Sequence, residues 1–417
     1  MNEQVHIIGG GISGLIAARV LEDHGLSPII IEASDRVGGR LRTDKIDGHL
    51  LDHGFQVLLT AYPSLKKYLD LEALHLTKFL PGSIIFHQGK KSLLGDASRN
   101  SKFLWPTMRS NAATLSDKLK VWKLNKELQA KPLDRIFSEP EVTTLEYLQK
   151  KGFSTRIIER FFRPFYSGIF LENELSTSSR MFEFVFKMFA QGSASLPYDG
   201  IEAIPRQLQD RLKRTSFHFN KPIAEIREHE IEFKSGEVIA REYLINATND
   251  PMLHSRNAPS AAPRHWKSCQ TLYFKSSGRV IHQPIIGLIA FKDALINNIC
   301  YSSRLYPHPD GEEMLSVTVV KEHHLGQDQL VKQVIKELRE HCGIDTDIEF
   351  TKLYDIPQAL PELNNLQYDL KPGSTQLDSH TFLTGDTMLN ASLNGAMLAG
   401  EQAALDVLKA IQEKDLQ

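Results

Sequence analysis

The sequence predicts an α/β fold in which a parallel-sheet domain is interrupted twice by a second, α+β domain. Near the N-terminus a strand, a glycine turn, a helix and a second strand follow one another, which is the βαβ pattern of a parallel sheet. Related glycine-containing and acidic segments return within residues 197–250 and 383–404. The blocks between them have helical and strand patterns of their own, so we expect both domains to be built from separated parts of the chain.

The first glycine turn has the spacing G-x-G-x-x-G, between a strand that begins at Val5 and a helix that ends before Gly25. In this pattern the first glycine permits the tight turn, the second admits a pyrophosphate close to the backbone, and the third lets the helix pack on the sheet. Free N–H groups and the positive end of the helix dipole then face the phosphates. The residues expected to form this dinucleotide site are Gly9, Gly11, Ile12, Ser13 and Gly14.

The second strand, residues 29–31, ends in an acid at Glu32, which lies 18 residues after Gly14. An acid about 20 residues beyond the glycine turn accepts hydrogen bonds from the ribose hydroxyls. It also disfavours a 2′-phosphate, so NADP is an unsuitable ligand. We expect Glu32, with Ala33 beside it, to bind the ribose.

A second glycine pair follows at once. Residues 32–43 read EASDRVGGRLRT, which resembles the E-A-x-x-R-x-G-G-R-x-x-T signature of the superfamily of flavin amine oxidases, protoporphyrinogen oxidases and phytoene desaturases. Adjacent glycines let a second loop close on the pyrophosphate, and arginines there supply charge-assisted hydrogen bonds to its oxygens. The residues expected in this loop are Arg36, Gly38, Gly39 and Arg40.

Three further segments match the same superfamily in order. Residues 47–56 resemble its D-x-G segment, which passes beside the isoalloxazine ring; residues 221–226 resemble the strand whose backbone contacts adenine. Residues 385–404 resemble the closing motif, in which an acid binds the ribitol and a helix N-terminus faces the pyrimidine edge of the flavin. The positions carried over are Gly54, Phe55, Gln56, Ile223, Gly385, Asp386, Asn394, Gly395 and Ala396.

This resemblance implies a Rossmann-type FAD-binding domain (glutathione-reductase-like) and an interleaved α+β substrate domain. We expect the FAD-binding domain to comprise residues 1–70, 195–250 and 371–417. The substrate domain then comprises a helical first insert, 71–194, and a mixed-sheet second insert, 251–370. The acid in Gly385-Asp386, where amine oxidases often have glutamate, favours the desaturase-like and protoporphyrinogen-oxidase-like branches.

The bulk properties exclude several other classes of protein. A net charge of −2 over 417 residues provides no general attraction for nucleic acid. Three cysteines without a C-x-x-C pair predict a reducing, cytoplasmic setting and no disulfide framework. No pattern of metal ligands stands out, so we expect no metal site. No apolar run reaches about 18 residues, so we expect no transmembrane segment.

Two features of the first insert have two interpretations each. Eight phenylalanines lie between Phe161 and Phe189, either as the wall of an apolar substrate tunnel or as ordinary core. Residues 102–131 contain seven basic and two acidic side chains. They form either a solvated helix face or a basic amphipathic helix in peripheral contact with a membrane. Leu115, Leu119 and Trp122 share one face of that helix.

The resemblance implies an FAD-dependent oxidoreductase that moves a hydride from a substrate C–H bond to flavin N5. C–C desaturation or dehydrogenation of a small, apolar molecule is favoured, with amine (C–N) oxidation as the alternative and oxygen or a quinone as candidate electron acceptors. Amine oxidases of the superfamily often place a lysine near N5; here the aligned position is Cys269, and Lys267 is the candidate catalytic lysine. An NAD-linked dehydrogenase and a non-enzymatic carrier of prenylated proteins, of the GDP-dissociation-inhibitor type, are the competing hypotheses.

Overall fold

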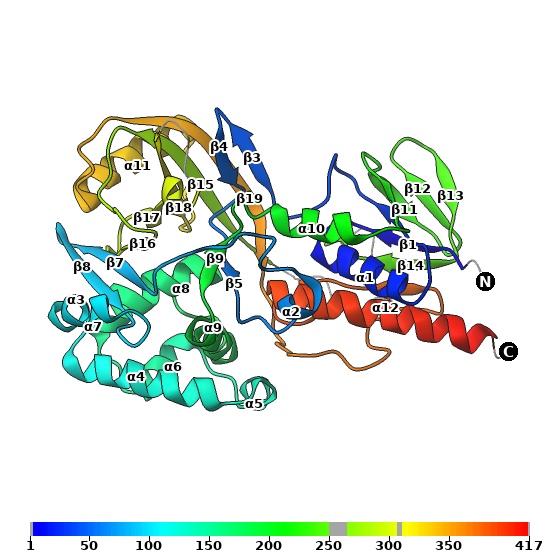
Figure 1. Ribbon diagram of the computed structural model, residues 1–417, viewed down its shortest axis with the longest axis horizontal. Helices are drawn as coiled ribbons and strands as arrows, with labels where there is room; N and C mark the ends of the chain where they lie inside the picture. The colour runs from blue at the N-terminus through cyan, green and yellow to red at the C-terminus, as the bar shows by residue number, and fades with distance from the viewer. Residues whose placement is uncertain (1–2, 250–264, 307–310, 416–417) are drawn as a thin grey trace.

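A computed structural model describes residues 3–249, 265–306 and 311–415 of the chain; residues 251–264, where we expected the second insert to begin, lie outside the described residues. A parallel sheet lies at one end of the molecule and a mixed sheet at the other, with a group of helices below the mixed sheet (Figure 1). The longest strand, β19 (Ile348–Pro361), and the longest helix, α12 (Leu393–Asp415), of the described residues connect the central region to these ends.

The parallel sheet takes its five strands from three separated parts of the chain. Its order is β10-β2-β1-β14-β20, and every neighbouring pair is parallel. The strands are β1 (Val5–Ile8), β2 (Ile29–Ile31), β10 (Ser216–His218), β14 (Tyr243–Asn246) and β20 (Thr381–Leu383). These strands come from residues 5–31, 216–246 and 381–383.

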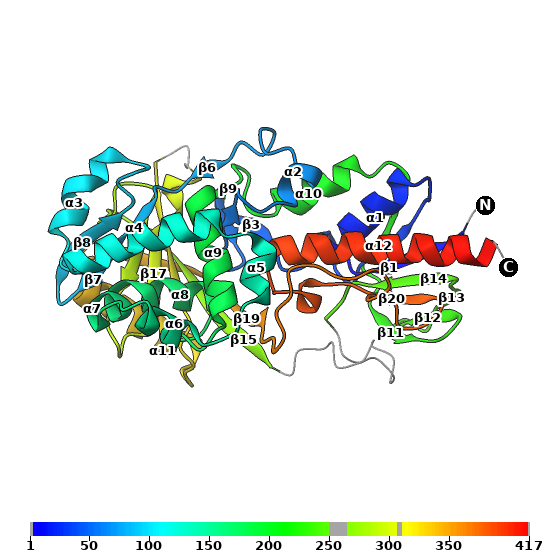
Figure 2. The same ribbon diagram turned by 90° about the horizontal axis from the view of Figure 1, so that it is seen from below.

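Two different layers cover the parallel sheet. Helices α1 (Ile12–Asp23), α10 (Ala203–Arg211) and α12 lie on one face, as the view from below also shows (Figure 2). An antiparallel sheet of β11 (Ile223–Ile226), β12 (Glu230–Phe233) and β13 (Val238–Ala240) lies on the other. Successive strand residues point to opposite faces, so Ile7 packs in the helical core and Ile8 against the antiparallel layer.

Glycines allow close packing where α1 meets its neighbours. A Cβ atom on Gly14 would overlap the carbonyl oxygen of Gly9, and one on Gly400 of α12 would overlap the carbonyl oxygen of Ser13. Helix α1 ends as expected before Gly25, which has a φ of +95°. The third glycine of the turn therefore has the packing role that its spacing predicts.

The mixed sheet has the order β19-β15-β18-β17-β16-β7-β8, in which the β16–β7 pair is parallel and the others are antiparallel. Its strands are β7 (Gly82–His87), β8 (Lys90–Gly95), β15 (Trp266–Ser276), β16 (Ile286–Ile289), β17 (Ile296–Tyr301), β18 (Glu313–Val319) and β19. Helix α11 (Gln327–Cys342) packs on one face through Leu330, Val334 and Leu338, and Gly343 is its C-cap. The β7–β8 hairpin from the first insert was not expected in this sheet.

Between residues 101 and 191 the first insert is helical. It contains α3 (Leu104–Arg109), α4 (Leu115–Ala130), α5 (Leu133–Ser138), α6 (Thr144–Lys150), α7 (Thr155–Ile157), α8 (Arg163–Phe170) and α9 (Ser179–Gln191). Capping boxes start α4 at Thr114 and Asp117, and α6 at Thr143 and Glu146. No helix in the described part of the chain has the length and hydropathy needed to cross a bilayer.

Short elements join these layers in the centre. They are the hairpin of β3 (Thr43–Ile46) and β4 (His49–Asp52), the helix α2 (Leu65–Tyr68), and a small sheet of β5 (Leu58–Leu59), β6 (Thr77–Lys78) and β9 (Ala194–Leu196). The hairpin carries the D-x-G segment to the boundary between the two larger sheets (Figure 1).

Candidate active site

A continuous cavity of about 1810 Å³ runs from the glycine turn to the helices of the first insert. Small-molecule sites usually occupy about 300–1,000 Å³, so this cavity has room for a dinucleotide and a second molecule. The predicted residues that line it are Gly9, Gly11, Ile12, Ser13, Glu32, Gly38, Gly39, Arg40, Gly54, Phe55, Gln56, Lys267, Gly385, Asp386 and Ala396. The structure therefore brings together residues from the beginning, middle and end of the chain.

The two glycine loops lie against each other at one end of the cavity, which we call the nucleotide end. A Cβ atom on Gly39 would lie 3.4 Å from the Cα of Gly11, whereas a Cβ on Gly11 would meet no atom within 4 Å and would enter open space. Gly11 is also the N-cap of α1, with no side-chain hydrogen bond at that cap. The turn thus presents a bare helix N-terminus to the cavity, as a phosphate site requires.

The carboxylate of Glu32 is held by neighbouring donors. Its Oε2 accepts a hydrogen bond of 2.7 Å from the Gly10 N–H, and its Oε1 accepts bonds of 2.9 Å and 2.7 Å from the N–H and hydroxyl of Ser34. These contacts leave the carboxylate at the cavity wall in one orientation. The side chain from which we expect ribose binding is therefore held in place, and its role stays a prediction.

Arg40 joins the second glycine loop to the C-terminal motif. Its Nη2 lies 2.6 Å from Oδ1 of buried Asp386, and its guanidinium also stacks over the ring of Trp266, 5.6 Å from the centroid. Replacing only one residue of such a pair is strongly destabilising, because it leaves the charge of the other residue without a partner. The pair fixes two segments of the cavity wall that are 346 residues apart in the sequence.

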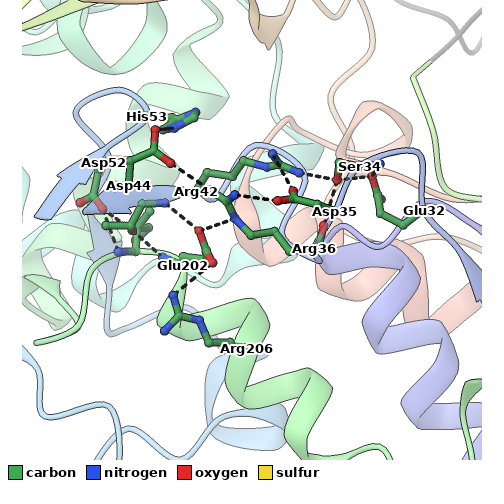
Figure 3. A network of polar contacts seen from close by, with 12 residues as sticks. Glu32, Ser34, Asp35, Arg36, Arg42, Asp44, Asp52, His53, Glu202 and Arg206 are labelled. Carbon is green, nitrogen blue, oxygen red and sulfur yellow. Dashed lines mark hydrogen bonds and ion pairs between the residues drawn. The ribbon is translucent and has the colours of Figure 1, made fainter. Parts of the chain in front are cut away.

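Arg36 has different partners from the expected pyrophosphate. Figure 3 shows its guanidinium among three carboxylates, at 3.2 Å from Glu202, 3.0 Å from Asp44 and 3.5 Å from Asp35, and it does not line the cavity. Burial opposes its charge, but these acids outweigh that effect and raise the pKa of Arg36. The geometry indicates that Arg36 supports the loop and that Arg40 is the arginine of this loop at the cavity.

The D-x-G segment adds a histidine that sequence reasoning left without a role. His53 lines the cavity, its Nε2 lies 2.9 Å from Oδ2 of Asp44, and its ring lies 4.2 Å from that of Tyr354. Burial would raise the pKa of Asp44, but hydrogen bonds from His53 and Tyr354 outweigh it and the pKa is lowered. The ionised carboxylate behind His53 fixes the direction of the imidazole. The contact between Asp44 and His53 could not be predicted from their spacing in the sequence, because it depends on the β3–β4 hairpin that brings the two residues together.

Asp52 anchors the same hairpin from inside the protein. It accepts hydrogen bonds from the Thr43 hydroxyl at 2.6 Å, the Ile201 N–H at 3.0 Å and the Tyr306 hydroxyl at 2.8 Å. Because Ile201 and Tyr306 lie outside the β3–β4 hairpin, Asp52 ties the hairpin to two other parts of the fold. Figure 3 shows Asp52 within this polar network.

Lys267 reaches the cavity from β15. Its Nζ donates to the Thr177 hydroxyl at 3.3 Å, and burial lowers the pKa of the ammonium while Glu172 and Glu362 act in the opposite direction. Cys269, at the position aligned with the family lysine, also lines the cavity, and burial raises its pKa to about 11. The position of Lys267 is compatible with the predicted role, which stays a prediction.

The phenylalanine cluster is divided between the core and the wall of the cavity. Phe162, Phe182 and Phe184 are fully buried core residues. Others line the far part of the cavity, namely Phe161, Phe165, Phe170, Phe186 and Phe189. This apolar wall faces a chamber that continues from the nucleotide end, so part of the cluster can contact a ligand.

Six predicted residues do not line the cavity. Gly14 packs α1 on the sheet, Ile223 is buried at the start of β11, and Gly395 donates its N–H to the Ser392 hydroxyl at 2.9 Å. The others are Ala33, Arg36 and Asn394. Around the N-terminus of α12, the cavity is instead lined by Asn390, Ala391, Ser392, Leu393 and Ala396. Ser392 was missed because its capping role depends on where α12 begins.

The parallel sheet, the bare glycine turn and the carboxylate of Glu32 at the cavity wall are features of a dinucleotide-binding protein, and the cavity continues into an apolar chamber. A family model for flavin-containing amine oxidoreductases matches residues 12–408. The chain therefore belongs to this family of FAD-dependent oxidoreductases, and FAD is its cofactor.

Individual relatives agree with this assignment. An L-amino-acid oxidase of Sistrurus catenatus edwardsii is 24% identical over 301 residues, which are 67% of this chain and 57% of the oxidase. The match thus spans little more than half the length of that relative. Protoporphyrinogen oxidase 2 of Arabidopsis thaliana is 38% identical over 68 residues, 16% of this chain and 13% of that protein.

Solved structures share the whole fold. A protein provisionally assigned as a protoporphyrinogen oxidase, from Exiguobacterium sp. 255-15, superposes with a TM-score of 0.72 at 16% identity, over 100% of both chains. A putrescine oxidase superposes with a TM-score of 0.66 at 17% identity, over 98% of this chain and 99% of the oxidase. At such identities the likeness concerns the fold.

Proposed function

We propose that the chain removes a hydride from a C–H bond of a small, apolar molecule held in the phenylalanine-lined chamber, next to FAD at the nucleotide end. The observation that carries this proposal is the continuity of one cavity from the glycine turn to the apolar wall. Residues 1–70, 195–250 and 371–417 then form the FAD-binding domain, and 71–194 with 251–370 form the substrate domain.

The residues present fit FAD. Gly11 leaves open space where a side chain would block a pyrophosphate, and the Glu32 carboxylate at the cavity wall can accept bonds from a ribose. Asp386, which the resemblance assigns to the ribitol, lines the cavity beside Arg40. When bound, FAD accepts a pair of electrons from the substrate as a hydride at its N5. The N-terminus of α12 points its positive dipole end at the cavity and so favours negative charge there.

The chain supplies orientation, exclusion of water and one titratable amine. The apolar wall excludes water from the chamber, and the exclusion of water strengthens electrostatic interactions inside it. We assign to Lys267 the task of holding or taking a proton near the reacting C–H or N–H group. Because burial lowers its pKa, the neutral amine forms at lower pH than for an exposed lysine.

C–C dehydrogenation or desaturation is the favoured reaction, because the chamber wall is apolar and the family lysine position holds Cys269. Amine oxidation is the second candidate, and the presence of Lys267 in the cavity favours it. Oxygen or a quinone would serve as the electron acceptor.

The spectrum of the purified protein tests the proposal. We expect a yellow protein with absorbance bands near ~450 and ~375 nm, which bleach without oxygen when the substrate is added. A screen of apolar alkenes, alkanes, porphyrinogens and amines under these conditions would identify the substrate class. Lys267→Met should keep the flavin bands and slow the bleaching at alkaline pH, whereas a colourless protein that takes up no FAD would favour the carrier hypothesis.

A further inference from the structure

Helix α4 has two apolar faces, and only one of them is buried. Leu124 and Leu128 pack into the core on one side. On the opposite side Leu115, Leu119 and Trp122 are 60%, 69% and 59% exposed. These three residues have the spacing of one helical face, so the exposure follows from the orientation of the whole helix. A face of this kind has no partner within the described chain.

Helix α3 extends the exposed apolar surface. It has no buried residue, and its Leu104, Trp105 and Met108 are all exposed. Lys118 of α4 donates to the Met108 carbonyl at 3.0 Å, which ties the two helices together. We call the six side chains Leu104, Trp105, Met108, Leu115, Leu119 and Trp122 the apolar platform. They are six of the ten large apolar side chains exposed among the described residues.

The charge around the apolar platform is positive. The exposed cations beside it are Lys102, Arg109, Lys123 and Lys126. The two acids of this segment are already engaged: Asp117 is buried and accepts bonds from Thr114 and Ser154, and Glu127 lies 2.6 Å from Lys151. The surface therefore combines exposed leucine and tryptophan with lysines whose charge is not compensated within α4.

The apolar platform is also the outer end of the cavity. Leu104, Met108, Leu115, Leu119 and Trp122 all line the same space that reaches the glycine turn. A ligand entering from this side would pass between α3 and α4 and then along the phenylalanine wall.

We propose that the apolar platform docks on the surface of a bilayer that contains anionic phospholipid. Protein interfaces are depleted in lysine, whereas interfacial amphipathic helices place tryptophan and leucine between basic side chains. Anionic headgroups attract such lysines, and the platform side chains enter the headgroup and acyl boundary. This proposal rests on the proposed function in one respect: the docked cavity would receive its apolar substrate directly from the lipid.

Sedimentation of the full-length, flavin-loaded protein with vesicles tests the proposal. Vesicles contain phosphatidylcholine alone, or with about 30% phosphatidylglycerol, at low and high salt. We expect the protein to sediment with the anionic vesicles and to be released by salt. Two of the three tryptophans, Trp105 and Trp122, lie in the platform, so their emission should shift to shorter wavelength on binding and be quenched by brominated lipid.

Matched variants separate the platform from general surface effects. Leu119→Ser with Trp122→Ser, and separately Lys123→Glu with Lys126→Glu, should each lower vesicle partitioning at least about tenfold. Lys336→Glu with Lys409→Glu is the charge control, since both lysines are exposed on other helices. Val238→Ser with Tyr198→Ser is the apolar control, since both side chains are exposed elsewhere. Both controls should partition like the unaltered protein.

Three results would overturn the proposal: equal binding of the platform variants and the controls, no binding to anionic vesicles, or a dimer in light scattering that Leu119→Ser with Trp122→Ser converts to monomer. Flavin absorbance is recorded on the same samples. A protein that binds vesicles but carries no flavin would contradict the proposed function alone, and a flavin-loaded protein that ignores vesicles would contradict the docking alone.

Discussion

The nucleotide end and the apolar platform lie at opposite ends of one cavity and are built in opposite ways. At the nucleotide end, the backbone of two glycine loops and a few charged side chains define the surface, and all of them except Asp386 lie within residues 9–40. At the platform end, apolar side chains from several helices define it, and no motif relates them. The difference teaches that a cofactor site can be specified by local sequence, whereas the substrate chamber is specified by how helices pack.

The largest effect should come from the glycine on which the nucleotide end depends for its fold. Gly14→Ala would drive a Cβ atom into the carbonyl oxygen of Gly9, where neither backbone can move freely. We expect the free energy of unfolding to fall by about 3 kcal/mol, and flavin to be lost with the fold. Thermal or urea unfolding followed by circular dichroism measures the change.

Gly326→Ala is the control for this substitution. Gly326 is the N-cap of α11, has a negative φ, and a Cβ atom there would meet nothing within 4 Å. Its effect should stay below about 1 kcal/mol. Similar losses for both variants would mean that the contact between Gly14 and Gly9 is not the cause.

The second largest effect should be a loss of FAD affinity, without a loss of stability, from a substitution at the nucleotide end. Gly11→Ala places a methyl group in the open cavity rather than in the packed turn. We expect an FAD dissociation constant about 30-fold or more higher, a loss of about 2 kcal/mol in binding, with little change in unfolding. Titration of the apoprotein with FAD, followed by flavin fluorescence, measures it. Unchanged affinity would show that the pyrophosphate does not pass Gly11.

A smaller loss of stability is expected from a substitution in the helical region, at Asp117, and this substitution should leave FAD binding unchanged. Asp117 accepts four hydrogen bonds, from the N–H and hydroxyl groups of Thr114 and Ser154, at 2.6–2.9 Å. Burial would raise the pKa of Asp117, but these bonds outweigh it and lower the pKa. Asp117→Asn should cost about 2 kcal/mol of unfolding free energy at neutral pH.

The stability difference between the wild type and Asp117→Asn should depend on pH in a defined direction. Because the folded pKa of Asp117 lies below its unfolded value of about 3.9, its stabilisation is present above that value and is lost as pH falls through the folded pKa. The gap between wild type and Asp117→Asn should therefore shrink in acid. Glu127→Gln, which removes an exposed ion pair in the same helix, should cost less than about 1 kcal/mol. If Asp117→Asn lost its flavin, the helical region and the nucleotide end would not be independent of each other, and the comparison drawn above would be wrong.

Most of the nucleotide end could be predicted from the sequence. The turn, the helix that follows it and the acid at Glu32 lie within 28 residues. Their spacing within one βαβ unit is therefore enough to predict a role for each. The end of the first helix before Gly25 was also predicted correctly, because its signal is local.

The remaining features depend on contacts that spacing does not encode. Arg36 has the family position, but Glu202, 166 residues away, competes for its guanidinium. The β7–β8 hairpin pairs with β16, about 200 residues later, so no local pattern assigns it to the mixed sheet. Periodicity correctly placed Leu115, Leu119 and Trp122 on one helical face, but it cannot say whether a face meets core or solvent.

The pair between Arg40 and Asp386 has a consequence for the order of biosynthesis. Domains generally fold as they leave the ribosome, N-terminal parts first. Here β1, α1 and both glycine loops emerge early, but β20, Asp386 and the start of α12 complete their surroundings only after residue 396 has been synthesised. A nascent chain therefore carries an open half-site through most of translation, and cofactor loading becomes a late event that any premature stop before α12 would prevent.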